Sequence, residues 1–276
     1  MENKDTKILV LGDRGMLGHI VKRYLKEQGY IVDGLNREHC DFKEHDRLFE
    51  FIEKFEPDYV INCSGILITG KDINEFAEIN IVLPRILQRF ATALDFKLIH
   101  ISTNCVFKDI GPHSIDETPD ATNLYGMSKA FGEINDDKNL TIRTSIIGPE
   151  LKNGSGLLNF VLNSGSEILG FTNAMWNGVT TLELAKHLPY MMVNNTGLIN
   201  FYTEKEINKY ELLCIINDIW KLEKKITAIK KENVHSSLLK GSFLTIKSYK
   251  KQLQELYDWY YLDKEEKNEE IDEALE

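Results

Sequence analysis

Short apolar runs alternate with amphipathic segments along the first half of the chain. Runs of mostly apolar residues predict strands at residues 7–11, 31–35, 59–61, 97–101 and 140–143. The apolar spacing between them predicts a helix from the glycine-rich turn at Gly12 to Gly29, and further helices over residues 48–55 and 79–94. Such alternation indicates parallel strands joined by helical crossovers, and therefore an α/β fold with a doubly wound parallel sheet.

The second half of the chain has a looser rhythm. From about residue 150 it is punctuated by turn residues such as Asn153-Gly154-Ser155-Gly156 and has few clear strands. We expect a nucleotide-binding domain over residues 1–150 and a smaller C-terminal substrate-binding lobe over residues 151–262, with excursions back to the sheet. We expect residues 263–276 to form an acidic, solvated tail.

Composition narrows the function classes. The net charge of −10 disfavours nucleic acid as a partner. The sequence has neither a long apolar run nor a signal-like N-terminus, so we expect a cytoplasmic protein that does not cross a membrane. The four cysteines are scattered, without metal-ligand spacing, which predicts neither a disulfide framework nor a metal site.

A glycine motif follows the first predicted strand and opens the first predicted helix. Glycines at this turn let the backbone approach a pyrophosphate, and the helix N-terminus offers unpaired N–H groups. The motif therefore predicts a Rossmann-type dinucleotide site, although its G-x-x-G-x-x-G spacing differs from G-x-G-x-x-G. The residues predicted to contact the cofactor here are Gly12, Arg14, Gly15, Met16, Leu17 and Gly18.

The end of the second strand favours NADPH over NADH. It reads Leu35-Asn36-Arg37, without the acid that usually binds the ribose hydroxyls in NAD enzymes. Arg37 and Arg14 are placed to bind a 2′-phosphate from two sides. Asp33 keeps NADH open as the less favoured cofactor. Other residues expected along the cofactor are Asn36, Asp41, Phe42, Cys63, Ser64 and Gly65.

A tyrosine and a lysine four residues apart, Tyr125 and Lys129, lie on one face of a predicted helix. A nearby ammonium is expected to lower the pKa of the phenol, so that Tyr125 can donate a proton near neutral pH. Thr103 follows a buried strand at the carboxyl edge of the sheet, where its hydroxyl is expected to bind a substrate carbonyl.

These motifs together resemble an extended short-chain dehydrogenase/reductase of the dTDP-4-dehydrorhamnose reductase family. The resembling segments are residues 7–18, 57–65, 77–84, 98–107, 116–133 and 142–149. The resemblance implies a catalytic triad of Thr103, Tyr125 and Lys129, with Asn80 supporting the lysine through a helix distortion. It also implies a homodimer that uses NADPH to reduce the C4 keto group of a nucleotide-linked 4-keto-6-deoxyhexose. A dTDP-4-dehydrorhamnose and a UDP-2-acetamido-2,6-dideoxyhexulose fit equally well.

One departure raises a second activity. Asn104-Cys105 stands where rhamnose-pathway reductases usually have Asp-Tyr. The glycine motif and Arg37 also resemble GDP-fucose synthase, in which a cysteine two residues after the catalytic hydroxyl moves protons during epimerisation. By this resemblance Cys105 epimerises C3, or C5, before C4 is reduced. No partner acid is identified; His113 lies in a suitable loop.

On the substrate side, the resemblance places Trp176 and Asn177 beside the substrate, together with Thr103, Asn104 and Cys105. Arg143 and Lys152 are candidates for the diphosphate.

Two other functions compete with the reductase. One is a non-catalytic NADP(H)-binding regulatory subunit, like the one that regulates methionine adenosyltransferase. The other is a sugar-nucleotide epimerase or dehydratase that recycles bound NAD.

Overall fold

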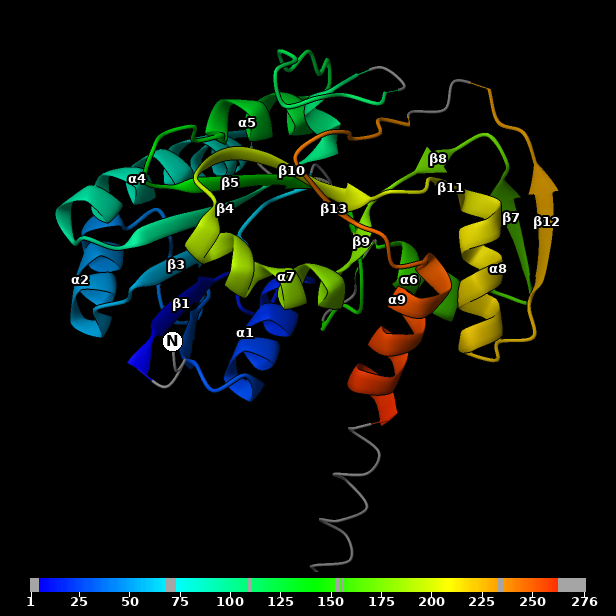
Figure 1. Cartoon of the computed structure of the whole chain (residues 1–276), viewed down its shortest axis with the longest axis horizontal. Coiled ribbons are helices and arrows are strands. Elements are labelled where there is room, and N and C mark those ends of the chain that lie inside the picture. The colour runs from blue at the N-terminus through cyan, green and yellow to red at the C-terminus, as the bar shows by residue number, and fades with distance from the viewer. Residues whose placement is uncertain are drawn as a thin grey trace, which may run out of the picture.

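The computed structural model describes residues 5–67, 73–108, 111–151, 154, 156–232 and 236–262. Its centre is a seven-stranded sheet in the order β13-β10-β5-β4-β3-β1-β2, and every pairing in it is parallel (Figure 1). The strands are β1 (Lys7–Leu11), β2 (Ile31–Leu35), β3 (Tyr59–Asn62), β4 (Lys97–Thr103), β5 (Leu140–Thr144), β10 (Gly197–Thr203) and β13 (Phe243–Thr245). The predicted α/β fold is confirmed.

Helices cover both faces of this sheet. On one face α1 (Gly18–Glu27) packs against α7 (Thr181–Asn194), and their apolar sides share a core with β1 and β5. On the other face α2 (His45–Phe55) and α4 (Leu83–Ala93) enclose a second core. The chain order reverses at β1, which lies between β2 and β3. Ligands of doubly wound sheets bind at such a switch point, beyond the carboxyl ends of the strands.

The helix predicted over residues 79–94 is longer and is distorted. It begins as α3 (Ile73–Ala77), passes through a π-helical turn at Glu78–Val82 and continues as α4. The extra residue of a π-turn interrupts the usual helical hydrogen bonding, and such turns are frequent at functional sites. The turn packs against α5 (Leu124–Gly132), the helix that carries the tyrosine–lysine pair.

A smaller lobe extends from the carboxyl side of the sheet. Its core is formed by α6 (Leu157–Asn163), α8 (Lys209–Ile219) and α9 (Tyr249–Tyr257). Short strand pairs frame it: β7 (Glu167–Phe171) with β12 (Lys225–Ile229), β8 (Met175–Trp176) with β11 (Ile207–Asn208), and β6 (Ile146–Ile147) with β9 (Val179–Thr180). A second π-turn, Asp258–Leu262, follows α9.

The described ranges of the chain show no sign of a membrane-spanning helix or of a metal-binding cluster. None of their helices is long and apolar enough to cross a membrane. Nor do they hold a group of three or more His, Cys, Asp or Glu residues that would suit a metal ion.

Candidate active site

The glycine turn after β1 is held in place from both sides. Gly12 has a positive φ of 76°, and its N–H donates to Leu35 O at the end of β2, at 2.7 Å. A Cβ at Gly18 would lie only 2.2 Å from Gly12 O, so the first turn of α1 packs too closely against the loop for any side chain there. The backbone at this turn is thus open to a ligand, as a pyrophosphate cradle requires.

Asp13 fixes this loop from inside the protein. Its buried carboxylate accepts hydrogen bonds from Lys22 Nζ on α1 at 2.7 Å and from Asn36 Nδ2 at 2.8 Å. Burial raises the pKa of Asp13, but the hydrogen bonds from Lys22 and Asn36 outweigh burial and hold it below its usual value. Asn36, predicted to contact the cofactor, therefore also braces the glycine loop.

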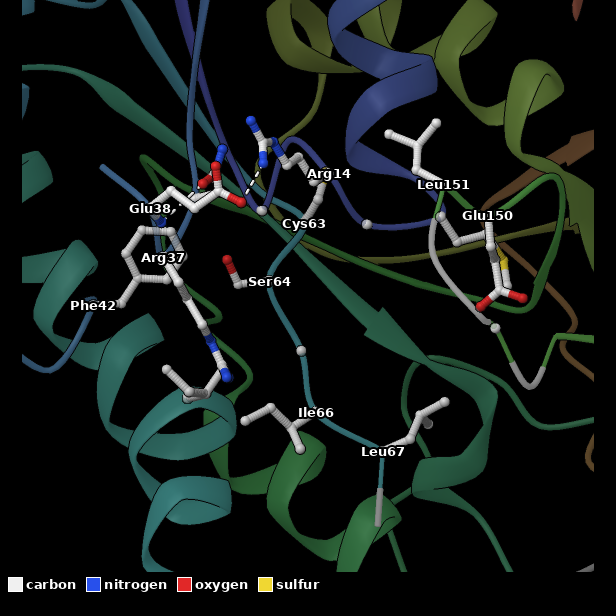
Figure 2. A pocket seen from close by; sticks show the side chains of 17 residues that line it. Arg14, Arg37, Glu38, Phe42, Cys63, Ser64, Ile66, Leu67, Glu150 and Leu151 are labelled. Carbon is white, nitrogen blue, oxygen red and sulfur yellow. Dashed lines mark hydrogen bonds and ion pairs between the residues drawn. The ribbon is translucent and has the colours of Figure 1, made fainter. Parts of the chain in front are cut away.

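A cavity of about 510 Å³ lies above the switch point between β1 and β3 (Figure 2). Of the predicted cofactor residues, most line it: Gly12, Arg14, Gly15, Met16, Asn36, Arg37, Phe42, Cys63, Ser64 and Gly65. Asp41 is not among the lining residues; its carboxylate accepts a hydrogen bond from Lys43 N at 3.1 Å and lies 3.4 Å from Lys43 Nζ. Leu17 is buried in the core beneath the loop, and Gly18 is also buried and does not line the cavity.

Two arginines that line the cavity, Arg14 and Arg37, each have an acidic partner. Arg14 forms an ion pair with Glu38, and Arg37 Nη1 lies 2.8 Å from Glu75 Oε1. Figure 2 shows the two guanidinium groups pointing in opposite directions, with Glu38 turned toward Arg14. Glu38, which follows the end of β2 by three residues and lines the cavity, was not among the predicted residues.

One polar atom in the cavity fits a bound dinucleotide. The Ser64 side chain points into the space, and its buried hydroxyl has no hydrogen-bond partner among the described residues (Figure 2). A buried hydroxyl without a partner is unfavourable, so a ligand atom there would satisfy it. Burial raises the pKa of the neighbouring Cys63 to about 12, against the charge of Lys129, so that thiol stays protonated.

Thr103 ends β4, and Tyr125, the second residue of α5, lies within hydrogen-bonding distance of the Thr103 side chain. The Asn123 side chain caps α5 by accepting from Gly126 N at 2.8 Å. Burial raises the pKa of Tyr125 to about 12, with a smaller contribution from Cys105, while a hydrogen bond with Thr103 opposes the rise. The expected lowering of this pKa by Lys129 is therefore wrong for the unliganded protein, because desolvation of the phenol dominates.

Lys129 is buried and does not line the cavity itself, but it lies within electrostatic range of Cys63, which does. Its ammonium donates to Ile101 O at 2.7 Å and lies 3.5 Å from His100 Nε2. Burial lowers the pKa of Lys129 to about 8. Burial, followed by the charge of Lys129, holds the pKa of His100 well below its usual value, so the imidazole is neutral. His100 was not predicted, although a histidine inside the apolar run of β4 is itself a signal.

Asn80, in the π-turn, joins the loop that follows β3 to α5. Its amide makes two 3.0 Å bonds to the backbone N and O of Ile66, and its Nδ2 donates to Ser128 Oγ at 3.2 Å. Ser128 Oγ in turn donates to Tyr125 O at 2.8 Å. The helix distortion expected at Asn80 is present, and the amide acts on α5 through Ser128.

Residues 8–135 match the profile of the NAD dependent epimerase/dehydratase family. The match covers a little under half of the chain, and this part of the chain is similar to that family. The chain is 32% identical over 133 residues to a dTDP-4-dehydrorhamnose reductase of Mycolicibacterium smegmatis, covering 46% of this chain and 40% of that protein. It is 25% identical over 242 residues to the spore coat polysaccharide biosynthesis protein SpsK of Bacillus subtilis, covering 82% and 84%.

The similarity in fold to solved structures extends over the smaller lobe. A solved structure of dTDP-4-dehydrorhamnose reductase from Bacillus anthracis, in complex with NADP, superposes with a TM-score of 0.82 at 17% identity. The superposition covers 93% of this chain and 100% of the Bacillus anthracis chain.

On the substrate side of this epimerase/dehydratase domain, two predicted asparagines have structural partners. Asn104 Nδ2 donates to Ser237 O at 2.7 Å. The Asn177 amide donates to Leu239 O at 2.7 Å and accepts from Leu239 N at 3.1 Å. The geometry does not support the hypothesis that Asn177 binds sugar hydroxyls, because its amide is already occupied at both ends.

Trp176 and Cys105 lie where the lobe meets the sheet. The Trp176 indole is buried, donates to Ser145 Oγ at 2.8 Å and faces the ammonium of Lys209, 5.1 Å from its ring centroid. Cys105 is within electrostatic range of both Tyr125 and Lys209. The structure therefore brings the predicted Thr103, Cys105 and Tyr125 together and adds Lys209, which the sequence analysis missed.

Two of the three other substrate-side candidates are engaged within the protein. Arg143 is buried and binds both carboxylate oxygens of Glu133 at 2.7 Å, so it is not available for a diphosphate. His113 Nδ1 lies 2.7 Å from Glu117 Oε2, and its ring stacks on Phe107. Lys152 lies outside the described residues.

Proposed function

We propose that the protein is an NADPH-dependent reductase of the C4 keto group of a nucleotide-linked 4-keto-6-deoxyhexose, in activated deoxysugar biosynthesis. The observation that carries this proposal is the grouping of Thr103, Tyr125 and Lys129 at the carboxyl end of β4, next to the cavity above the glycine turn. The similarity of the chain to a dTDP-4-dehydrorhamnose reductase supports the substrate class.

The chain's own groups supply the proton. NADPH, when bound, supplies the hydride that is added to C4 of the sugar. Tyr125 donates the phenolic proton to the C4 oxygen, which becomes a hydroxyl, and Thr103 holds that oxygen by a hydrogen bond. Lys129 lies one helical turn after Tyr125, and its ammonium now donates to Ile101 O. This ammonium would bind the hydroxyls of the nicotinamide ribose in place of that carbonyl.

Arg14 and Arg37 favour NADPH as the cofactor. Both line the cavity where the adenosine ribose of a dinucleotide lies in this fold, and a 2′-phosphate would replace their present glutamate partners. The same pair disfavours an enzyme that permanently holds NAD. Purified protein without a bound dinucleotide is the expected result, and tightly retained NAD would favour the epimerase or dehydratase alternative.

The test is a panel of 4-keto-6-deoxy sugars linked to dTDP, UDP or GDP, with and without a 2-acetamido group, incubated with NADPH and analysed by mass spectrometry. We expect one member to gain two mass units as NADPH is oxidised, and Tyr125→Phe to slow this by about 10²- to 10⁴-fold. NADPH binding without turnover of any member would instead favour the regulatory-subunit alternative.

Cys105 supports a second, preceding step. A hydrogen on carbon 3 or 5, next to the C4 ketone, is acidic, and a thiolate is a usable base. We propose that the thiolate of Cys105, beside Tyr125, removes the proton from C3, or C5, before reduction, and that water returns a proton to the opposite face of the resulting enolate. Exchange of substrate protons for deuterium without NADPH tests this. Exchange that persists unchanged in Cys105→Ser would rule out the proposed role of the thiol.

The expected homodimer has a candidate interface on α5. Leu124, Met127 and Phe131 share one face of this helix and expose 49%, 39% and 61% of their surface. We propose that two copies of the chain pair through this face. Light scattering should report twice the mass of one chain, and Phe131→Glu should shift the protein toward monomer at low concentration. A wild type that is monomeric at micromolar concentration would contradict the proposal.

A further inference from the structure

Lys209 is a cation of the smaller lobe that has no acidic partner among the described residues. It is the first residue of α8, and its backbone N–H donates to Ala174 O at 2.9 Å, next to β8. Its side chain is partly exposed, yet protein atoms surround its ammonium closely enough for desolvation to lower its pKa to about 8. No described residue forms a hydrogen bond or an ion pair with this ammonium.

Other lysines of the lobe contrast with Lys209. Lys225 pairs with Glu167 at 2.9 Å, and Lys247 lies 2.6 Å from Glu183 Oε2. Lys224 Nζ donates to backbone carbonyls that include Leu162 O, at 3.4 Å. A desolvated ammonium that lacks such partners is unfavourable by itself, and an anion that enters the site would remove that penalty.

The position of Lys209 points to the reacting sugar. Pairing of β11 with β8 sets Ile207 opposite Trp176, which places Lys209 beside the indole. Lys209 is also within electrostatic range of Cys105, which follows Thr103 by two residues. The ammonium is therefore close both to the indole of the lobe and to the segment that follows β4.

A nucleotide sugar carries its charge close to the ring that reacts. The phosphate joined to C1 is separated from C4 by only the width of the sugar ring. We propose that Lys209, seated over Trp176, binds the sugar-linked phosphate of the nucleotide-sugar substrate and so fixes the distance of C4 from Tyr125. This inference rests on the proposed function, because it assigns the anion of that same substrate.

The test separates binding from chemistry. Lys209→Met keeps a side chain of similar length against Trp176 and removes the charge. Lys205→Met is the matched control, because Lys205 is exposed and precedes Lys209 by four residues. Binding of UDP, dTDP and GDP is measured by calorimetry with NADP⁺ present, and binding of NADPH is measured separately.

We expect Lys209→Met to weaken the best-bound nucleoside diphosphate by about 10- to 100-fold, the value of a charge-assisted hydrogen bond. NADPH binding should be unchanged, and Lys205→Met should match the wild type. The affinity of the wild type should also fall above about pH 8 as Lys209 loses its proton, and Lys209→Met should lack this fall. Retained folding is checked by the unchanged NADPH affinity.

Three outcomes would overturn the inference. Equal affinity of Lys209→Met and wild type for the diphosphate, in a wild type that reduces its substrate, rejects Lys209 and leaves the proposed function intact. If Lys209→Met lost affinity only for a nucleotide-linked hexuronate, measured in the same way, and kept its affinity for the nucleoside diphosphates, Lys209 would bind a carboxylate on the sugar and the phosphate assignment would be rejected. A wild type that neither binds a nucleoside diphosphate nor reduces any sugar nucleotide rejects the proposed function, and the inference with it.

Discussion

Glu38 holds Arg14 by an ion pair inside the cavity that the adenosine ribose is expected to occupy. Both side chains are about half exposed, at 45% and 57%, so the pair itself adds little stability. Its importance is for the ligand. A 2′-phosphate would compete with Glu38 for the same guanidinium and would be repelled by the carboxylate.

We predict that Glu38→Gln strengthens NADPH binding by about fivefold, because it frees Arg14 and removes a negative charge from the cavity. NADH binding should stay the same or weaken. Fluorescence titration with both cofactors at low salt measures the change. Glu53→Gln, an exposed acid on α2, is the control. A gain for NADH in Glu38→Gln would show that Glu38 does not oppose the 2′-phosphate.

Local sequence patterns predicted some features of this protein and missed others, including Glu38. The strands at residues 7–11 and 31–35 were predicted with their observed bounds. The first is an almost uninterrupted apolar run, as expected of a buried parallel strand, whereas the second lies at the sheet edge and also holds Asp33 and Gly34. Local motifs also predicted that Thr103, Tyr125 and Lys129 belong to one site. Glu38 was passed over because it lies beyond the strand end, where sequence distance does not say which way a side chain turns.

Contacts between distant segments were hidden from the sequence. The Asn104 amide meets Ser237 O across 133 positions, and Lys209 reaches the surroundings of Cys105 from another lobe. The phenol of Tyr125 was misjudged for a related reason. A helical spacing of four predicted the ammonium nearby, whereas the depth of burial, which sets the pKa, depends on the whole fold.

A second prediction concerns Asn80. Asn80→Ala leaves the buried backbone of Ile66 without its partners and removes the link to Ser128, so the free energy of unfolding should fall by about 1–3 kcal/mol. Because Ile66 lines the cavity, KM for NADPH should also rise. Ser128→Ala, which keeps both Ile66 bonds, should affect KM less. Equal effects of the two substitutions in denaturation and in KM would contradict this coupling.

A third prediction concerns alkaline pH. The Lys129 pKa of about 8 means that the ammonium loses its proton as the pH rises through 8, whereas Tyr125, at about 12, stays protonated. If the ammonium binds the nicotinamide ribose, NADPH affinity should fall by up to about 10-fold above this pH. Titration of NADPH binding from about pH 6 to pH 10 measures it. Lys129→Met should bind weakly and without pH dependence; a pH-independent wild type would exclude this role.

The last prediction concerns acid stability and Asp13. Its folded-state pKa lies below the usual value, because the hydrogen bonds from Lys22 and Asn36 outweigh the effect of burial. The unfolded chain therefore binds a proton at a higher pH than the native protein does. Asp13 thus stabilises the fold above about pH 4, and this contribution disappears as the pH falls through the lower, folded-state pKa.

Asp13→Asn should remove roughly 1–3 kcal/mol of unfolding free energy at neutral pH, and its stability should change less than that of the wild type below about pH 4. Urea denaturation at several pH values measures both effects. Because Asp13 braces the glycine turn through Asn36, NADPH affinity should fall in the same variant. Asp46→Asn, on the exposed start of α2, is the control. Parallel pH curves for Asp13→Asn and wild type would show that the Asp13 carboxylate is not held in its charged form.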